Sequence, residues 1–492
     1  MICFWTLLIY IRIDTLMTIK LNIGYVATAI APYYSNEYKV REKSEASLKK
    51  LLGNFDVNFI PFHKTIFSKK DSLEAEKFFK NKVDFLLLQT SSCSSGEQLY
   101  PLCNITDKMG IWAVPDIEVE GDVKLHSLVS TSHYLAMIKK VLSDKDITTK
   151  WFYNYADTDE FINKFSVTIR SLVALKKMKH AKIGLVGGIS PGFDNMKVDQ
   201  SIIKKNIGLS VEESTIKELV KIADSFDQKI IDSEVIKIKS AASSISVSND
   251  DSFNKVTRIY FALKKMKEDN NWDSLAVQCW SQMQELYGVA PCMAYGWLGS
   301  EDGIAVSCEG DVQGSMSMLL LNYISNAEKS STLLDLATFD KKADAVQMWH
   351  CGVSPRHFSN EDGIKWVDHT TLGRKTDKKY GVAGDQVFAP QETTTTYISN
   401  NAERILILNS SIFEHTNKGF DGTRGWFRNI HLNRKKITSE NLVNTLNMVG
   451  HEHHYAVGQG DYSKELIEFA AWNKLKLIKE IPLVDYLSPM DD

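Results

Sequence analysis

The chain has 492 residues, of which 43% are hydrophobic and 24% charged, and its 58 basic and 61 acidic side chains give a formal charge of −3. This balance, without any basic run, favours neither nucleic acid nor an anionic membrane surface as a partner. The length is too great for one hydrophobic core and predicts about three domains of an ordinary globular protein.

The first segment, residues 1–19, is predicted to be an N-terminal extension. Its apolar run is too short to span a bilayer, and Arg12 and Asp14 follow the run instead of preceding it as in a signal peptide. We therefore favour Met17 as the natural start over a targeting segment. Seven cysteines without a CxxC pair argue against a disulfide framework and predict a reduced, cytoplasmic setting.

Strand-like and helical patterns alternate through the first two-thirds of the chain. This alternation is typical of parallel sheets covered by helices, and a glycine-rich restart at 181–188 begins a second such domain. The predicted strands are 21–30, 83–90, 109–116, 181–188, 275–279 and 303–307, and the predicted helices include 42–52, 73–81 and 157–177.

Beyond about residue 345 the pattern changes to threonine-rich and aromatic strands at 393–399, 404–411 and 420–427, with a helix at 463–474. Such strands are typical of antiparallel sheets with one exposed face. The predicted fold is therefore α/β, with two Rossmann-like α/β domains followed by a mostly antiparallel, barrel-like domain. Their predicted boundaries are 20–178, 179–345 and 346–492.

Four separated stretches each offer a residue that binds hard or borderline metal ions. They are CEGD at 308–311, LLD at 333–335, WHCG at 349–352 and HEHH at 451–454. Carboxylates and imidazoles together form a mixed oxygen and nitrogen set, which suits Mn²⁺ or another octahedral divalent ion. Glu452 or Asp461 could accept a hydrogen bond from a ligating imidazole.

Each of these residues also has an ordinary structural interpretation. Glu309 could form an ion pair and Asp311 could cap the following helix, while Asp335 suits a turn or a helix cap. A single buried histidine such as His350 is more often a core residue than a ligand, and the late histidines could form a solvated patch. The metal hypothesis therefore depends on all four stretches occurring together.

The stretch CWSQMQELYGVAPCMAYGWLGSEDGIAVSCEGD at 279–311, followed by SMSMLLLNYIS, LLD and HCG, resembles the signature region of the L-fucose/L-arabinose isomerase superfamily. The resemblance runs from about residue 20 to the C-terminus and is strongest over 275–356. It implies that Glu309, Asp335, His350 and His454 bind Mn²⁺, with His451 and His453 in supporting roles. Whether His453 or His454 is the ligand stays open.

The resemblance implies an aldose–ketose isomerase of the L-fucose or L-arabinose type, which moves a proton between C2 and C1 through a cis-enediol. Glu309 and Asp335 would then exchange the roles of base and acid. Asp335 matches the fucose branch, whereas the arabinose branch has glutamate there. A homo-oligomer, trimer or hexamer, is also implied.

Three residues are further predicted as walls of the sugar pocket: Trp297, Trp349 and Arg356. The alternative function is a non-catalytic sugar-binding or sensor protein built on the same α/β domains. A simple sugar receptor needs no metal, so the carboxylate and histidine set favours the enzyme.

Overall fold

A computed structural model describes residues 19–482, so the predicted N-terminal extension lies almost entirely outside the described residues. The chain divides into two compact units between Phe165 and Ser166. Helix α5 (Asp159–His180) runs across this division. No helix within residues 19–482 is long and apolar enough to cross a membrane. The predicted domain boundaries stay predictions.

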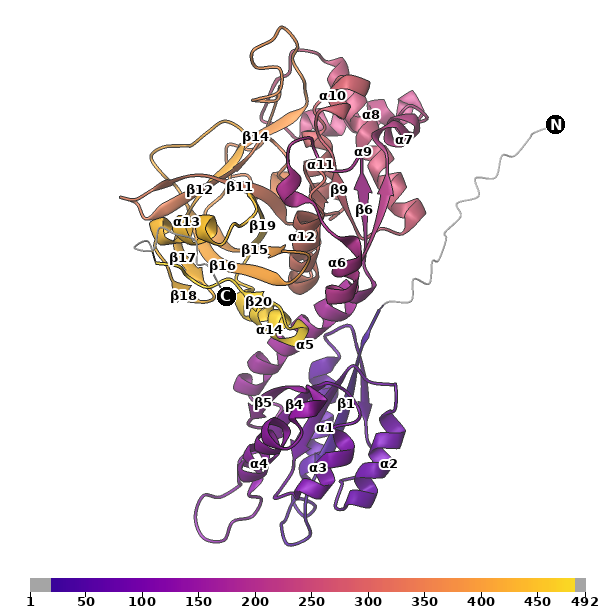
Figure 1. Cartoon of the computed structure of the whole chain (residues 1–492), viewed down its shortest axis with the longest axis vertical. Coiled ribbons are helices and arrows are strands. Elements are labelled where there is room, and N and C mark those ends of the chain that lie inside the picture. The colour runs from indigo at the N-terminus through magenta and orange to yellow at the C-terminus, as the bar shows by residue number, and fades with distance from the viewer. Residues whose placement is uncertain (1–18, 483–492) are drawn as a thin grey trace, which may run out of the picture. The chain divides into compact units, whose positions relative to one another are not determined.

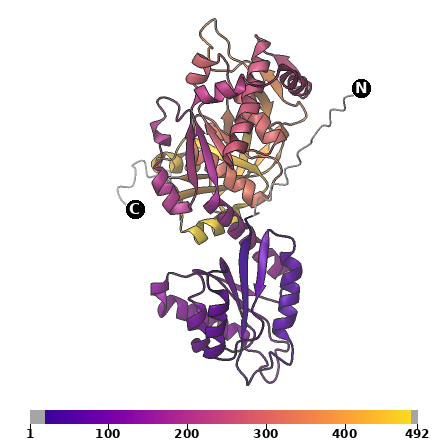
Figure 2. The same ribbon diagram turned by 90° about the vertical axis from the view of Figure 1, so that its right-hand side faces the viewer.

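The first unit is built around a parallel sheet with the strand order β2-β1-β3-β4-β5 (Figures 1 and 2). The central strands β3 and β4 are buried along their whole length, as the β-α alternation predicts, whereas the outer strands β2 and β5 are partly exposed. Helices α2, α3 and α4 cover one face, where Phe79, Leu99 and Tyr134 pack against Leu86 and Ile111. The elements of this unit are β1 (Leu21–Thr28), α1 (Val40–Leu52), β2 (Val57–Pro61), α2 (Lys69–Phe79), β3 (Phe85–Thr90), α3 (Gly96–Leu102), β4 (Lys108–Ala113), α4 (Ser127–Lys140) and β5 (Thr148–Tyr153).

The second unit begins with another parallel sheet, whose strand order is β10-β9-β6-β7. The strand that follows β6 in sequence, β7, lies on one side of it, and the next strand of this sheet, β9, lies on the other. Ligands of parallel sheets bind where the strand order reverses in this way, so the expected ligand position is the crevice beyond the carboxyl ends of β6 and β9. The elements of this part are β6 (Lys182–Val186), α6 (Gln200–Ile207), β7 (Ser210–Ser214), α7 (Ile216–Ala223), α8 (Gln228–Ser240), β8 (Ser244–Ser246), α9 (Asp251–Asn270), β9 (Ser274–Val277), α10 (Gln282–Leu286), α11 (Cys292–Glu301), β10 (Val306–Ser307) and α12 (Val312–Ser325).

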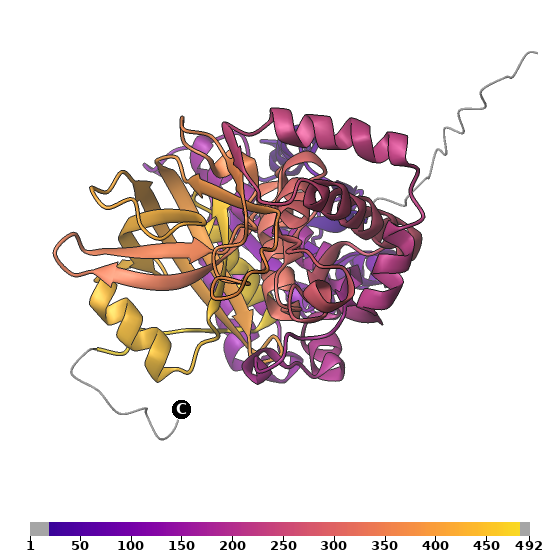
Figure 3. The ribbon, with the colours of Figure 1, turned by 90° about the horizontal axis from the view of Figure 1, so that it is seen from above.

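The remaining strands form a closed antiparallel barrel, as the sequence predicts. Strands β16, β15, β19, β11, β12 and β17 pair in that order, and a β16–β17 pairing closes the ring. Leu334, Leu336 and Met348 pack inside the barrel. In Figure 3 the β11–β12 hairpin projects away from the helical layer of this unit.

Strands β15 and β16 agree closely with the predicted strands 393–399 and 404–411, whereas β17 is displaced toward the C-terminus relative to the predicted strand 420–427, and β11 precedes the predicted boundary at 345. These elements are β11 (Thr332–Asp340), β12 (Ala345–His350), β13 (Lys365–Val367), β14 (Ala383–Val387), β15 (Gln391–Ser399), β16 (Arg404–Phe413), β17 (Thr423–Leu432), β18 (Lys435–Lys436), α13 (Ser439–Met448), β19 (His454–Gln459), α14 (Ser463–Asn473) and β20 (Lys476–Leu477).

Candidate metal centre

A tight turn at the carboxyl end of β10 presents Glu309. Glu309 has a φ of 61° and Gly310 a φ of 75°, so two successive residues adopt the left-handed conformation. The Ser190 N–H donates to the Glu309 carbonyl (2.9 Å), and the Gly310 N–H donates to the Val277 carbonyl (3.1 Å). The loop after β6 and the end of β9 therefore hold the turn, and Glu309 lies at the crevice expected for a ligand.

Neighbouring barrel strands bring the other predicted ligands together. Asp335 of β11 pairs with His454 of β19 on one side and with Trp349 of β12 on the other. Directly opposed residues point to the same face of a sheet, and Leu334 and Leu336 point into the barrel, so Asp335 points out of it. His350 is the last residue of β12.

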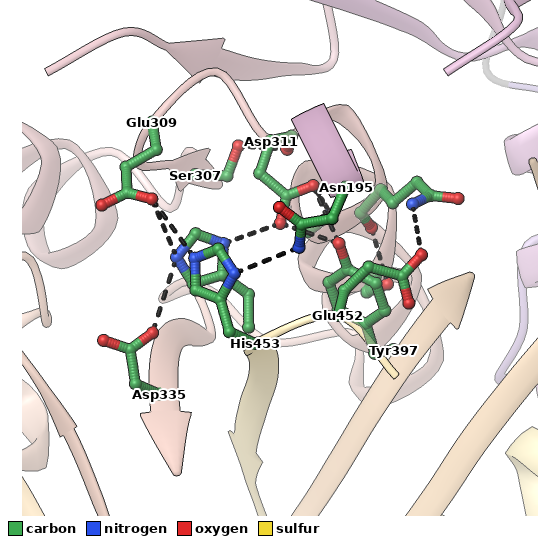
Figure 4. A network of polar contacts seen from close by, with 12 residues as sticks. Asn195, Ser307, Glu309, Asp311, Asp335, Tyr397, Glu452 and His453 are labelled. Atoms are coloured by element: carbon green, nitrogen blue, oxygen red, sulfur yellow. Dashed lines mark hydrogen bonds and ion pairs between the residues drawn. The ribbon is translucent and has the colours of Figure 1, made fainter. Parts of the chain in front are cut away.

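The predicted ligands converge, and Figure 4 shows Glu309, Asp335 and His453 of this cluster. Asp335, His350 and His454 each have a potential ligand atom within 4.8 Å of the other two, and the same holds for Glu309, His453 and His454. His454 Nε2 is 3.6 Å from Asp335 Oδ1 and 3.7 Å from Glu309 Oε2. His454 belongs to both groups, so it lies at the centre of the cluster.

Three atoms of the cluster are buried without a hydrogen-bond partner anywhere in residues 19–482: Asp335 Oδ1, His350 Nε2 and His454 Nε2. An unpaired buried polar atom is destabilising by roughly 1–3 kcal/mol, so three together need an explanation. Each is a good ligand atom for a divalent cation, and two carboxylates and two imidazoles suit Mn²⁺. The residues present therefore fit the predicted metal.

His454 is fixed by a partner behind it. Its Nδ1 lies 2.9 Å from Asp311 Oδ2, and both side chains are fully buried. Asp311 also accepts the Tyr397 hydroxyl at 2.9 Å and the Gly314 N–H at 2.9 Å, and so caps α12 as predicted. When Nδ1 donates to this carboxylate, Nε2 is left with a free lone pair toward the cluster, which is the usual arrangement of a metal-binding histidine.

His350 faces the cluster through its other nitrogen. Its Nδ1 lies 2.8 Å from the Cys351 backbone nitrogen and 3.1 Å from Cys351 Sγ, which leaves Nε2 for the cluster. Burial lowers the pKa of His350, but the negative charges of Cys351 and Asp335 outweigh burial and raise this pKa to about 10.

The two carboxylates differ in environment. Burial raises the pKa of Asp335, against the opposing charges of His350 and His454. Glu309 Oε2 instead lies 3.3 Å from His453 Nε2, in a side chain that is 15% exposed. The Asp335 side chain is 27% exposed, so both carboxylates are half-buried and differ mainly in their imidazole partners.

Four residues near the cluster were not predicted as substrate contacts. His453 was given only a supporting role, and its side chain is 35% exposed, whereas that of His454 is 0% exposed. Its Nδ1 is 3.4 Å from the Asn195 amide nitrogen, and its ring centroid lies 5.2 Å from that of Phe193. Phe193 in turn meets Trp280 edge-on at 5.8 Å. Phe193 and Asn195 follow β6 and Trp280 follows β9, and only this position after predicted strand ends could have indicated these three. His453 immediately precedes β19.

His451 lies behind the cluster. Its Nδ1 donates to the Glu452 carbonyl (2.6 Å), and its ring stacks on Tyr455 with centroids 5.1 Å apart. Burial lowers the pKa of His451 to about 4. Burial raises the pKa of Glu452, which accepts a hydrogen bond from Gln313 at 3.0 Å.

The three predicted pocket residues do not lie together. The Trp349 ring stacks parallel to His350 at 6.3 Å and therefore borders the cluster. Trp297 is buried, donates to Glu234 Oε1 (2.8 Å) and lies 5.6 Å from the Arg356 guanidinium, which also pairs with Glu301. Within residues 19–482 neither Trp297 nor Arg356 makes a hydrogen bond, ion pair or ring contact with the cluster. Their role as pocket walls stays a prediction.

No family model matches the chain. The chain is similar to curated proteins that are each named sulfoquinovose isomerase. That of Priestia aryabhattai is 25% identical over 394 residues, covering 79% of this chain and 83% of the relative. That of Alkalicoccus urumqiensis is 23% identical, covering 75% and 80%, and that of Clostridium sp. (strain MSTE9) is 22% identical, covering 74% and 79%.

These relatives confirm the predicted class: the chain is an enzyme, an aldose–ketose isomerase. They do not confirm the narrower resemblance to L-fucose or L-arabinose isomerases, because their name gives a different sugar. The metal and its four ligands, the cytoplasmic location and the homo-oligomer stay predictions.

Proposed function

We propose that the chain is a Mn²⁺-dependent isomerase that converts sulfoquinovose, or a closely related six-carbon aldose, into its ketose. The observation that carries the metal is the convergence of three unpaired buried ligand atoms, from Asp335, His350 and His454, beside Glu309. The named relatives support sulfoquinovose as the first substrate to test. L-Fucose and L-arabinose are the second choice, because the CEGD and HCG elements resemble those isomerases.

Glu309, Asp335, His350 and His454 would hold the ion. When bound, Mn²⁺ supplies a positive charge that polarises the sugar oxygens and makes the C–H beside the carbonyl more acidic. Asp311 keeps His454 in the tautomer with a free Nε2, and Tyr397 keeps Asp311 in place.

Isomerisation removes a proton from C2 of the open-chain aldose and returns one to C1, while a hydroxyl proton moves from O2 to O1. Asp335 is suited to one of these steps, because burial raises its pKa and makes its carboxylate a stronger base than an exposed one. Glu309 is suited to the other, because its Oε2 lies 3.3 Å from the imidazole Nε2 of His453. The two carboxylates lie on opposite sides of His454, with Oδ1 of one at 3.6 Å and Oε2 of the other at 3.7 Å from its Nε2.

The open side of the cluster is the proposed sugar position. His453, Asn195, Phe193 and Trp280 border it with one imidazole, one amide and two aromatic rings. Aromatic faces pack against the C–H groups of sugars, and the amide can exchange hydrogen bonds with hydroxyls. This side also fits the crevice between β6 and β9.

The test is ketose formation by the full-length protein, followed by ¹³C NMR with sulfoquinovose, L-fucose and L-arabinose. We expect turnover of sulfoquinovose with Mn²⁺, loss of turnover after EDTA and dialysis, and recovery on adding Mn²⁺. Ketose formation from L-fucose or L-arabinose but not from sulfoquinovose would assign the chain the substrate of the L-fucose or L-arabinose isomerases instead. Ketose from none of the three, nor from a wider panel of aldoses, would overturn the proposal.

Matched variants separate catalysis from simple sugar binding. Glu309→Gln and Asp335→Asn should each reduce kcat by about 10²–10⁴-fold. Glu361→Gln changes an exposed carboxylate of the same unit and should not affect kcat. A wild-type protein that binds sugar equally well with and without Mn²⁺, and turns none over, would favour the sugar-binding or sensor alternative.

A further inference from the structure

A second group of potential metal ligands lies beside the first. One ligand atom each from Cys292, Cys351 and His369 lie within 4.8 Å of one another, and all three residues are buried. Cys308 and Cys279 lie close enough to these thiols for the four sulfurs to shift one another's pKa. Four of the seven cysteines of the chain therefore meet at one place.

These cysteines come from four different elements. Cys279 follows β9, Cys292 begins α11, Cys308 follows β10 and Cys351 follows β12. None of the four is paired in a disulfide, and all are buried. Buried cysteines commonly act as small apolar residues, but a group of them converging beside an imidazole is also a ready set of soft ligands.

His369 has a different role from the cysteine sulfurs. Its Nδ1 accepts the backbone N–H groups of Leu372 (3.0 Å) and Thr371 (3.2 Å). In a neutral ring the proton is then on Nε2, which makes His369 a hydrogen-bond donor to a nearby thiolate. The metal ligands of this group are accordingly the sulfurs.

We propose that Cys292, Cys308 and Cys351 bind a soft d¹⁰ cation such as Cu⁺, Zn²⁺ or Cd²⁺, separately from the Mn²⁺ site. Thiolate sulfur selects these ions over Mn²⁺, which prefers the oxygen and nitrogen set next to it. Two sulfurs that share a tetrahedral Zn²⁺ lie about 3.8 Å apart, so Cys292 and Cys351 need to move by at most about 1 Å. Each thiol that binds releases its proton to solvent as the sulfur–metal bond forms.

Binding here should affect the other site. Cys351 Sγ is 3.1 Å from His350 Nδ1, and the Cys351 backbone nitrogen is 2.8 Å from the same atom. Cys308 immediately precedes Glu309. A cation that draws Cys351 and Cys308 together therefore pulls on two proposed Mn²⁺ ligands, and we expect soft cations to inhibit the isomerase. This second effect rests on the proposed function, whereas the binding does not.

The experiment is a Cd²⁺ titration of the full-length protein with excess Mn²⁺ present, followed by the ultraviolet charge-transfer band of Cd²⁺–thiolate bonds. We expect the band to saturate at one Cd²⁺ per chain. Cys292→Ser and Cys351→Ser should weaken Cd²⁺ binding at least 10-fold. Cys103→Ser, at a buried cysteine of the other unit, is the matched control and should leave the band unchanged.

The absence of a saturable band in the wild type would overturn the proposal, and so would an undiminished band in both Cys292→Ser and Cys351→Ser. Circular dichroism melting checks that each variant folds, and Cys308→Ser replaces any variant that does not. Activity is a separate readout: we expect one equivalent of Cd²⁺ to reduce turnover at least 10-fold in the wild type but not in Cys292→Ser. A band without any turnover by the wild type would leave the cation site standing and overturn only the isomerase.

Discussion

Asp311 Oδ2 lies 2.9 Å from His454 Nδ1, with both side chains fully buried. This contact determines which nitrogen of His454 faces the cluster. It also ties the cap of α12 to the first residue of β19, so the parallel-sheet layer and the barrel meet at the proposed metal ligand.

The first prediction concerns this contact. Asp311→Asn should weaken Mn²⁺ binding about 10–100-fold, because an amide oxygen holds the Nδ1 proton less firmly than a carboxylate. Tyr397→Phe is the control, since it removes one donor to Asp311 but keeps the contact with His454, and it should weaken binding less. Isothermal titration calorimetry measures both. Equal Mn²⁺ affinities in Asp311→Asn and the wild type would show that Asp311 only caps the helix.

The second prediction concerns stability without metal. Burial raises the pKa of Asp335, so its folded pKa lies above its unfolded value. The protonated carboxyl group of Asp335 therefore makes its full contribution to folding stability below the unfolded pKa. This contribution is lost as the pH rises through the folded pKa. Metal-free Asp335→Asn should therefore be at least as stable as the wild type at pH 8, and saturating Mn²⁺ should reverse the order.

Thermal melting with EDTA and with Mn²⁺ tests this reversal. At a concentration of 100 Kd, a bound ion stabilises the wild type by about 2.7 kcal/mol, which Asp335→Asn should lack. A metal-free Asp335→Asn that melts well below the metal-free wild type at pH 8 would indicate a structural role for this carboxylate.

The third prediction compares two glycines with the same positive φ. Gly310 and Gly188 both have a φ of 75°. A Cβ on Gly310 would lie 2.1 Å from the Gly188 carbonyl oxygen, whereas a Cβ on Gly188 meets no described atom within 4 Å. Gly188→Ala should therefore destabilise by about 1–2 kcal/mol, from backbone strain alone.

Gly310→Ala adds a clash with backbone and should destabilise by about 1–3 kcal/mol more, besides moving Glu309. Urea unfolding measures both variants, and Mn²⁺ titration should show weakened binding only for Gly310→Ala. Equal losses in the two variants would mean that the close approach of the loop after β6 is unimportant.

The fourth prediction is a pH effect away from the metal centre. Burial, with the nearby charge of Lys329, lowers the pKa of His357 to about 4. A histidine whose folded pKa is depressed contributes stability above its unfolded pKa of about 6.5. This contribution is lost as the pH falls toward the folded pKa. The loss at pH 5 is on the order of 2 kcal/mol.

His357→Gln should therefore lose less stability than the wild type between pH 7 and pH 5 in urea unfolding. His180→Gln, at an exposed position of the same unit, is the control and should follow the wild type. Parallel pH profiles for the wild type and His357→Gln would contradict the prediction.

Much of the fold follows from local patterns. The buried strand at 85–90, the helix at 312–325 and the threonine-rich strand at 391–399 all match predicted segments, because hydrophobic periodicity and turn residues act locally. The closed barrel order depends on pairings between distant strands, such as β11 with β19, and no local pattern encodes it.

The candidate site, like the fold, was predictable from the sequence only in part. The motifs together with the family resemblance indicated Glu309, Asp335, His350 and one of two late histidines, and the structure brings these residues together. Asp311 was predicted to cap a helix, which it does, but its contact with His454 crosses 143 residues of sequence. Phe193 and Asn195 lie in a loop with no motif, so only the tertiary structure identifies them beside His453.

The most direct test of the central claim is the number of Mn²⁺ ions bound per chain, counted by electron paramagnetic resonance titration of free Mn²⁺. We predict one tightly bound ion in the wild type and at least about 100-fold weaker binding in Asp335→Asn and in His454→Gln. A wild type that binds no Mn²⁺, or variants that bind it as tightly as the wild type, would contradict a metal centre formed by these residues.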